Sequence, residues 1–114
     1  MIAKKNIYFM DCHLAGRKYH DADEVWEQLN VGTQLKLMAE PDNRFDPYAV
    51  GVLFHAKDNE DYLLGYIPRG ENKQLSAFFE MGWSDIFECR ISQLDAEAHP
   101  EEQVQLTIKI KKRT

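Results

Sequence analysis

The sequence predicts a mainly β fold with two short helices, arranged as a small barrel or half-open barrel of about six strands. Six segments, closely spaced along 114 residues, show the alternation or the continuous apolar run that is typical of strands. Only two short segments show helical spacing. Strands at this spacing, with helices inserted between them, favour a barrel over a parallel βαβ sheet. The length corresponds to a single domain, residues 1–114.

The first three elements follow from the periodicity of apolar residues. Alternate apolar positions predict a strand over residues 8–14, with these side chains facing the core: Tyr8, Met10, Cys12 and Leu14. After Gly16, residues 21–29 have the spacing of a short helix with acids in its first turn. Its apolar face consists of Val25, Trp26 and Leu29. A second strand follows, with Leu35, Leu37 and Ala39 facing inward.

The middle of the chain predicts a turn followed by a hairpin. A dense run of turn formers, Glu-Pro-Asp-Asn-Arg-Phe-Asp-Pro, occupies residues 40–47. A nearly continuous apolar strand follows over residues 48–54. The hairpin loop is expected at residues 58–61, and the returning strand runs over residues 62–67 until Pro68 stops it.

The last third of the chain predicts one helix and two long strands. Asn72 is a candidate N-cap for a helix that buries Leu75, Phe78 and Phe79 and ends near Gly82. Alternate residues of the two strands are expected to face one core. These residues are Phe87, Cys89 and Ile91 on the first strand, and Val104, Leu106, Ile108 and Ile110 on the second.

Charge is unevenly distributed along the chain. Fourteen basic and nineteen acidic residues give a net charge of −5, and four of the basic residues lie within positions 109–113. This acidic balance argues against tight, nonspecific binding of duplex nucleic acid, which needs a broad basic face, but it permits a small basic pocket. The basic segment at 109–113 is interpreted as a solvated strand end, with a stripe that follows phosphates as the alternative.

Several protein classes lack their signatures here. No apolar run approaches the ~20 residues of a transmembrane helix, and the N-terminus has no signal-peptide core, so we expect a cytoplasmic protein with no membrane partner. The two cysteines form no CxxC pair and the four histidines lack zinc-ligand spacing, so no cofactor is expected. No P-loop, GxGxxG or Ser-His-Asp order occurs, and the carboxylates of Asp42 and Asp46 have no base or metal partner. The chain is therefore not expected to be an enzyme.

Four separated motifs resemble those of a known family. They are Ala15-Gly-Arg-Lys-Tyr-His, Leu29-x-x-Gly-Thr-x-Leu-x-Leu, Glu40-Pro-Asp-Asn-Arg-Phe-Asp-Pro-Tyr-Ala-Val-Gly-Val and Leu64-Gly-Tyr-Ile-Pro-Arg. With this order and spacing, from about residue 7 to residue 82, the chain resembles the HIRAN domain family. It is most similar to the family's stand-alone bacterial members.

The resemblance implies a modified OB-like barrel and a role in binding nucleic acid. In the helicase-like transcription factor, the HIRAN domain is fused to a Swi2/Snf2 ATPase and a RING finger, and it recognises the 3′ end of single-stranded DNA. Neither neighbour is present in these 114 residues. By resemblance we expect a non-catalytic module that binds 3′ ends of single-stranded DNA in DNA repair or replication, with a helicase or nuclease as a partner protein. The alternative is a protein-interaction module of the same fold without DNA binding.

Eight residues match or replace the family's DNA contacts. By resemblance, Asn43, Phe45 and Asp46 form an end pocket, and its rim consists of Arg17, Lys18, Tyr19, Tyr66 and Arg69. Lys18 stands where the DNA-binding relative has a stacking aromatic, which is a departure from the family pattern. In such a pocket an aromatic ring stacks on a base, and a guanidinium binds a phosphate. The carboxylate of Asp46 would accept a hydrogen bond from a 3′-hydroxyl and repel a 3′-phosphate.

The same residues also have simpler structural interpretations. Asn43 and Asp46 have the spacing of side chains that bond to the backbone of their own turn. Phe45 is also a candidate core anchor. The three cations of the rim are, taken singly, ordinary surface charges, so their convergence on one pocket is a prediction about the fold.

Overall fold

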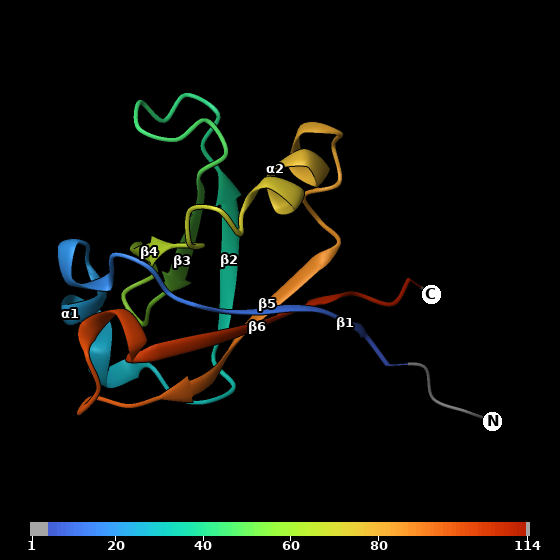
Figure 1. Cartoon of the computed structure of the whole chain (residues 1–114). Coiled ribbons are helices and arrows are strands. Elements are labelled where there is room, and N and C mark those ends of the chain that lie inside the picture. Colours follow the sequence, from blue (N-terminus) through green and yellow to red (C-terminus); the bar gives the residue numbers. More distant parts are fainter. Residues whose placement is uncertain (1–4, 114) are drawn as a thin grey trace.

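The computed structural model describes residues 5–113 and contains six strands, two α-helices and three short 3-10 helices (Figure 1). The strands are β1 (Ile7–His13), β2 (Gln34–Ala39), β3 (Val50–His55), β4 (Asp61–Tyr66), β5 (Phe87–Leu94) and β6 (Val104–Ile110). The helices are α1 (Ala22–Val25), α2 (Lys73–Glu80), η1 (Arg17–Tyr19), η2 (Trp26–Gln28) and η3 (Pro100–Glu102). The predicted class is confirmed. Within the described residues, no helix is long and apolar enough to cross a membrane.

The strands form one antiparallel sheet in the order β1-β6-β5-β2-β3-β4. Along β1 and β6, Ile7 pairs with Ile110 at one end and His13 pairs with Gln105 at the other. Register shifts interrupt the β1–β6, β3–β4 and β5–β6 pairings. Such irregularities bend strands and increase their twist. The sheet can therefore coil until its two edge strands approach each other.

A short backbone bridge joins the two edges of the sheet. Just beyond β1, the N–H of Ala15 donates to the carbonyl of Tyr66, and the N–H of Tyr66 donates to the carbonyl of Ala15, both at 2.9 Å. The strand ladders leave the described sheet open, as in a half-open barrel, and this isolated bridge is where its two edges meet. Gly65 permits the approach, because a Cβ at this position would lie 2.4 Å from the carbonyl oxygen of Ala15.

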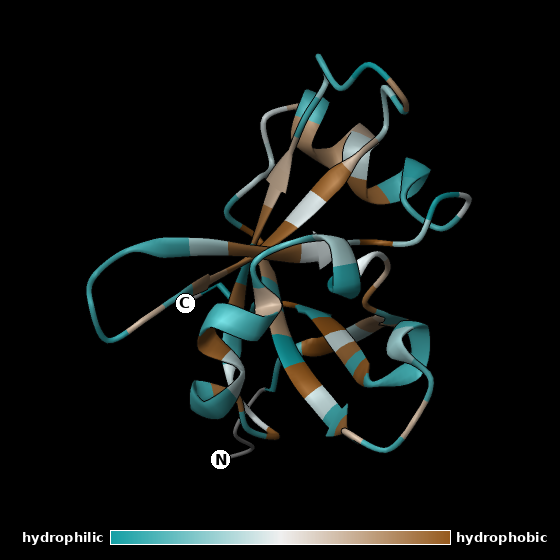
Figure 2. Ribbon diagram, turned by 90° about the vertical axis from the view of Figure 1, so that its left-hand side faces the viewer, coloured by the Kyte–Doolittle hydropathy of each residue, from teal (hydrophilic) through white to brown (hydrophobic). Residues whose placement is uncertain are grey.

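The core is built from the inward faces of all six strands. In Figure 2 the strands show alternating brown and pale or teal bands, whereas the loops are mainly teal. The predicted phase of β5 and β6 is confirmed, because Cys89 pairs with Ile108 and Ile91 pairs with Leu106, and all four residues are buried.

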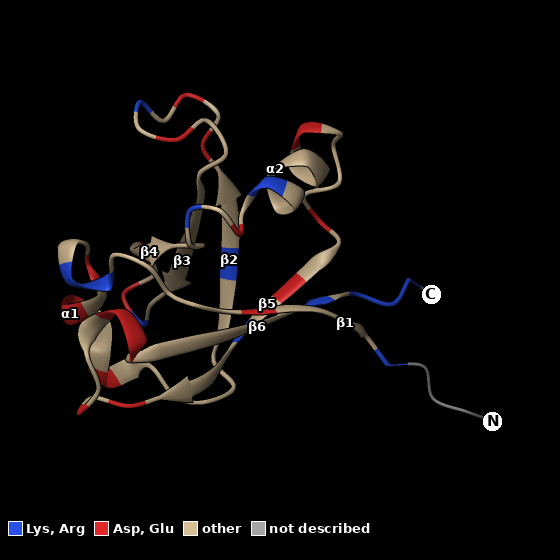
Figure 3. Cartoon of the chain, viewed as in Figure 1, with Lys and Arg blue, Asp and Glu red and all other residues tan. Residues whose placement is uncertain are grey.

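Basic and acidic residues are concentrated in different parts of the molecule. Figure 3 shows Lys and Arg on the C-terminal tail and at the start of β1, whereas Asp and Glu gather around α1 and η3. Basic residues of η1 also lie beside α1, and acidic residues lie early in β5 near the tail, so each end of the β1–β6 pair has an excess of one sign and not a single sign.

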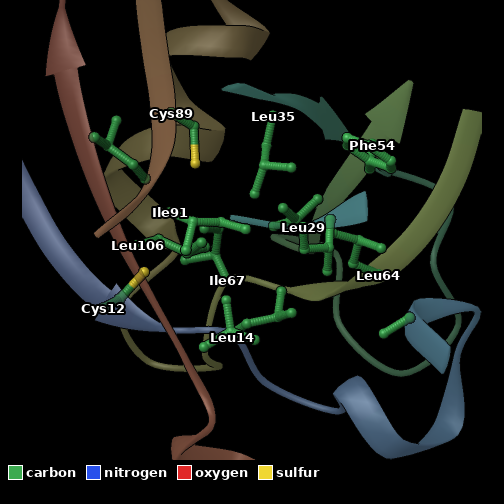
Figure 4. Packing of buried hydrophobic residues seen from close by; sticks show 14 of the residues in the cluster. Cys12, Leu14, Leu29, Leu35, Phe54, Leu64, Ile67, Cys89, Ile91 and Leu106 are labelled. Carbon is green, nitrogen blue, oxygen red and sulfur yellow. The ribbon is translucent and has the colours of Figure 1, made fainter. Parts of the chain in front are cut away.

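Both cysteines belong to the core, where side chains from different strands converge (Figure 4). Cys12 and Cys89 are buried free thiols. Burial raises the pKa of Cys12 to about 12, and it raises the pKa of Cys89 as well. The two side chains therefore pack as small neutral hydrophobes.

The predicted phase of the first strand is wrong at its beginning. Tyr8 is 59% exposed, and Phe9 instead packs against the rings of Phe78 and Phe87, at centroid distances of 6.0 and 5.3 Å. The register shift between Tyr8 and Met10 explains the difference, because one extra residue reverses the face to which the preceding side chains point. Periodicity by itself does not reveal such a bulge.

The two helix predictions also need correction. Residues 22–25 alone form an α-helix, and the chain then tightens into η2, although Val25 and Leu29 are buried as expected. Asn72 lies at the N-cap of α2 but its side chain makes no capping bond. Its Nδ2 donates instead to Oδ2 of Asp46 at 2.8 Å. A residue predicted to act locally therefore ties α2 to the turn at residues 40–47.

The glycine at the bridge gives a test of the barrel closure. Gly65→Ala is expected to lower the free energy of unfolding by about 3 kcal/mol, at the upper end of overpacking costs, because the obstacle is backbone. Gly51→Ala is the control, since its Cβ would meet side-chain atoms of Glu40 and Leu63 at 3.2 Å, and these can move. Urea unfolding measures both variants. Equal losses would contradict a special requirement at Gly65.

Candidate functional site

A cavity of about 420 Å³ opens beside the bridge between Ala15 and Tyr66. Three segments that are distant in sequence form its walls: the chain just after β1, the turn at residues 40–47 with its exit, and the end of β4 with the loop that follows. The lining residues are Ala15, Gly16, His20, Asn43, Phe45, Asp46, Ala49, Tyr66, Ile67 and Arg69. We refer to this cavity as the bridge pocket.

Asn43 organises the turn that forms one wall of the bridge pocket. Its Oδ1 accepts hydrogen bonds from the backbone N–H groups of Phe45, at 2.9 Å, and Asp46, at 3.1 Å. Its Nδ2 donates to Glu40 at 3.1 Å, and the same carboxylate accepts a hydrogen bond from the hydroxyl of Tyr66 at 2.8 Å. The turn is therefore fastened to β4. Burial, and then the bond to Glu40, raise the pKa of Tyr66 to about 12, so its hydroxyl is a neutral donor at physiological pH.

Asp46 is held as a carboxylate by two hydrogen bonds. Its Oδ1 accepts from the backbone N–H of Tyr48 at 2.9 Å, and its Oδ2 accepts from Nδ2 of the buried Asn72 at 2.8 Å. The Tyr48 bond, followed by the Asn72 bond and the charge of Arg69, lowers the pKa of Asp46 below its ordinary value of 3.8. Each carboxylate oxygen accepts two hydrogen bonds, so Asp46 keeps accepting capacity for a ligand.

Phe45 and Arg69 form the outer part of the bridge pocket. The side chain of Phe45 is 80% exposed, so its interpretation as a core anchor is wrong. Arg69 donates from Nη2 to the carbonyl oxygen of Phe45 at 2.6 Å. This bond uses one of the five N–H donors of the guanidinium and leaves the others available to an anion.

The three sequence-predicted residues of η1 lie outside the bridge pocket. Arg17 is buried, with Nη2 2.8 Å from Asp23 and Cζ 4.2 Å from the ring centroid of Trp26. It lines a separate cavity of about 650 Å³ that also has three acidic residues in its wall. Lys18 and Tyr19, the two residues after Arg17, are exposed. The structure thus brings together five of the eight predicted residues: Asn43, Phe45, Asp46, Tyr66 and Arg69.

Three residues of the site had no role assigned from the sequence. His20 lines the bridge pocket, with its ring centroid 5.3 Å from that of Tyr66 at an angle of 59°. Glu40 connects the turn to β4, and Asn72 holds Asp46. His20 and Glu40 lie within two of the motifs quoted above, and this position was the signal that could have identified them as site residues. Asn72 gave no signal beyond helix capping.

The bridge pocket is equipped for recognition. It offers a fixed carboxylate, a guanidinium, an exposed phenyl ring and a phenol beside an imidazole, which together suit a ligand with a hydroxyl, an anionic group and a planar ring. Between residues 5 and 113, no cluster of three or more His, Cys, Asp or Glu side chains could hold a metal ion.

Comparison with known proteins gives a family and a fold. The sequence profile of the HIRAN domain matches residues 7–113. A Fanconi-associated nuclease 1 homolog from Oryza sativa subsp. japonica is 30% identical over 84 residues, which are 74% of this chain and 8% of that protein. This chain therefore corresponds to a small part of that relative's length.

Two solved structures share the fold. A protein from Lactobacillus plantarum matches with a TM-score of 0.73 and 21% identity, over 93% of this chain and 96% of its own. The HIRAN domain of human HLTF matches with a TM-score of 0.59 and 14% identity, over 95% of this chain and 82% of its own. The OB-like barrel expected from the sequence motifs agrees with both matches.

The bond between Asn72 and Asp46 predicts a pH-dependent loss of stability. Asn72→Ala is expected to lower the free energy of unfolding at neutral pH by about 1.5–3 kcal/mol, because it removes a hydrogen bond to a charged group. The pKa of Asp46 is lowered in the folded protein, so this contribution is present above pH 3.8 and is lost as the pH falls through the lowered pKa.

Thermal unfolding of the wild type and Asn72→Ala across this pH range measures the effect. Gln74→Ala is the control, because Gln74 is exposed and lies in the same helix. A loss in Asn72→Ala that does not change with pH would mean that the charge of Asp46 is not involved.

Proposed function

Because the chain belongs to the HIRAN domain family, we propose that it is a non-catalytic module that binds nucleic acid and that its bridge pocket takes the 3′ end of single-stranded DNA. One observation above all supports this function. The ionised carboxylate of Asp46, the exposed ring of Phe45 and the guanidinium of Arg69 line one pocket. These groups match the hydroxyl, base and phosphate of a terminal nucleotide.

The aromatic residues of the bridge pocket would hold the terminal base. Phe45 is an exposed ring in the lining of the pocket, and Tyr66 and His20 contribute two further rings that lie close together. Stacking of this kind tolerates any base, because every base has a π-face. Only Tyr66 and His20 have polar atoms in their rings, so few hydrogen bonds could distinguish one base from another. We therefore expect weak preference among bases.

The phosphates would be bound from the rim. Arg69 can hold a phosphate with two parallel hydrogen bonds. The exposed Lys18 and Tyr19, although outside the bridge pocket, would contact the next nucleotide. Arg17 would join them by exchanging the exposed carboxylate of Asp23 for a phosphate. A few such contacts are compatible with a net charge of −5.

The relatives favour a setting in DNA repair or replication. The rice relative is named as a nuclease homolog, and this chain corresponds to only 8% of its length. A binding module that captures a DNA end complements such an enzyme without repeating its chemistry. A helicase or a nuclease is therefore the proposed protein partner.

Recognition of the free end predicts discrimination against a 3′-phosphate. A short single strand with a 3′-phosphate should bind at least about tenfold more weakly than the same strand with a 3′-hydroxyl, because a charge-assisted hydrogen bond is lost and a negative charge faces Asp46. Competition measured by fluorescence anisotropy tests this. Equal affinity for both ends would refute end recognition, even if DNA binding remained.

Asp46→Asn separates end recognition from a purely structural role. The amide still bonds a hydroxyl but repels a phosphate less, so the discrimination should shrink. Asp42→Asn is the matched control, since Asp42 lies in the same turn and is exposed. It should leave the discrimination unchanged.

Stacking on Phe45 predicts a loss of affinity with little loss of stability. Phe45→Ala should weaken binding by about 1–3 kcal/mol, the usual contribution of one stacked base. Its melting temperature should change little, because the ring is 80% exposed. Phe45→Tyr should retain binding. A large fall in melting temperature without loss of affinity would contradict the proposed role.

A further inference from the structure

The cations at the C-terminal end of β6 form a surface that the bridge pocket does not use. The backbone N–H of Lys111 donates to the carbonyl of Ile86 at 2.7 Å, and that of Lys112 donates to Oδ1 of Asn6 at 2.9 Å. These bonds hold the tail between the segments that precede β5 and β1. We define the basic edge as the five cations of this region: Lys5, Lys109, Lys111, Lys112 and Arg113.

The basic edge concentrates charge that the rest of the chain lacks. Without its five residues, the chain has nine basic and nineteen acidic residues, a net charge of −10. All five side chains are exposed. Within residues 5–113, no carboxylate lies within ion-pair distance of the ammonium groups of Lys109, Lys111 or Lys112, although Glu88 is the register partner of Lys109 on β5. Arg113 lies 3.9 Å from the exposed Asp85. These cations are available to an external anion.

Two exposed aromatic rings accompany the cations. Trp83 is 51% exposed, with Cζ of Arg113 6.0 Å from its ring centroid. Tyr8 is 59% exposed and pairs in register with Lys109 on the neighbouring strand. Cations interleaved with open aromatic faces are the composition of surfaces that bind single-stranded nucleic acid.

The basic edge is separate from the bridge pocket. Ala15 follows the end of β1 where His13 pairs with Gln105, whereas the tail continues from Ile110 at the opposite end of the same pair. Seven residues of β6 span about 20 Å between these two ends. Figure 3 shows the tail on the right and β4 with α1 on the left.

We propose that the basic edge is a second nucleic-acid site, which holds the sugar-phosphate backbone of a single strand and stacks bases on Trp83 and Tyr8. This inference rests on the proposed function in taking nucleic acid as the ligand. It differs from that function in needing no free end. A strand bound at its 3′ end in the bridge pocket would gain affinity with length when it reaches the basic edge.

The test uses two labelled probes with the full chain: a circular oligothymidylate, which has no 3′ end, and a thymidine trinucleotide with a free 3′-hydroxyl. The wild type should bind the circle. Trp83→Ala should weaken that binding about tenfold, and Trp83→Phe should retain most of it. Lys111→Gln with Arg113→Gln should reduce the slope of log affinity against log salt by about 1.4, or ~0.7 for each phosphate group that the variant no longer binds.

The controls separate this proposal from the proposed function. Lys57→Gln, at an exposed cation beyond β3, should not alter binding of the circle. Every variant of the basic edge should bind the trinucleotide as the wild type does, and failure of the trinucleotide to bind would count against the bridge pocket alone. The second site is refuted if the wild type does not bind the circle. In that case an acidic protein would be the expected partner of the basic edge. It is also refuted if Lys57→Gln lowers affinity as much as the changes at Lys111 and Arg113.

Discussion

The two backbone hydrogen bonds between Ala15 and Tyr66 are the interaction on which the site depends. They bring the chain after β1 against the end of β4, so Gly16 and His20 face the turn at residues 40–47. This close approach requires a position without a side chain, and Gly65 supplies it, since any Cβ there would meet a carbonyl oxygen at 2.4 Å. The absence of a side chain at Gly65 is therefore necessary for the pocket to form. Because the bridge also joins the two edges of the sheet, the stability of the fold and the shape of the site are coupled.

The turn at residues 40–47 is tied to its neighbours at three points although it is a loop rich in polar residues. Glu40 fastens its beginning to Tyr66, Asn72 fastens Asp46 to α2, and Arg69 binds the carbonyl of Phe45. Three neighbouring elements therefore fix the groups that would meet a ligand. Preorganisation of this kind reduces the entropy lost on binding, so a small pocket can bind with useful affinity. The same bonds explain why the turn-forming residues and the residues of the proposed site coincide here.

The separation of charge lets an acidic protein present one cationic region. Carboxylates cluster around α1 and η3, whereas the basic edge lies at the other end of the β1–β6 pair (Figure 3). Charges on the surface are screened beyond about 8 Å at physiological ionic strength, so the distant carboxylates do not cancel the attraction of the basic edge for an anion. Net charge alone is therefore a poor guide to where this chain would bind phosphate.

Local patterns in the sequence predicted the fold class, the strand phases of β5 and β6, and the turn that contains Asn43, Phe45 and Asp46. These features depend on local periodicity and turn chemistry, which involve only residues that are close together in the sequence. The tertiary structure alone decided the exposure of Tyr8, since a bulge reverses a strand face without a local signal. It also decided that Asn72 binds Asp46 instead of capping α2, and that Arg17 turns towards Trp26 and Asp23. Asn72 and Asp46 are 26 positions apart in sequence, so their bond forms only when the folded chain brings the turn against α2.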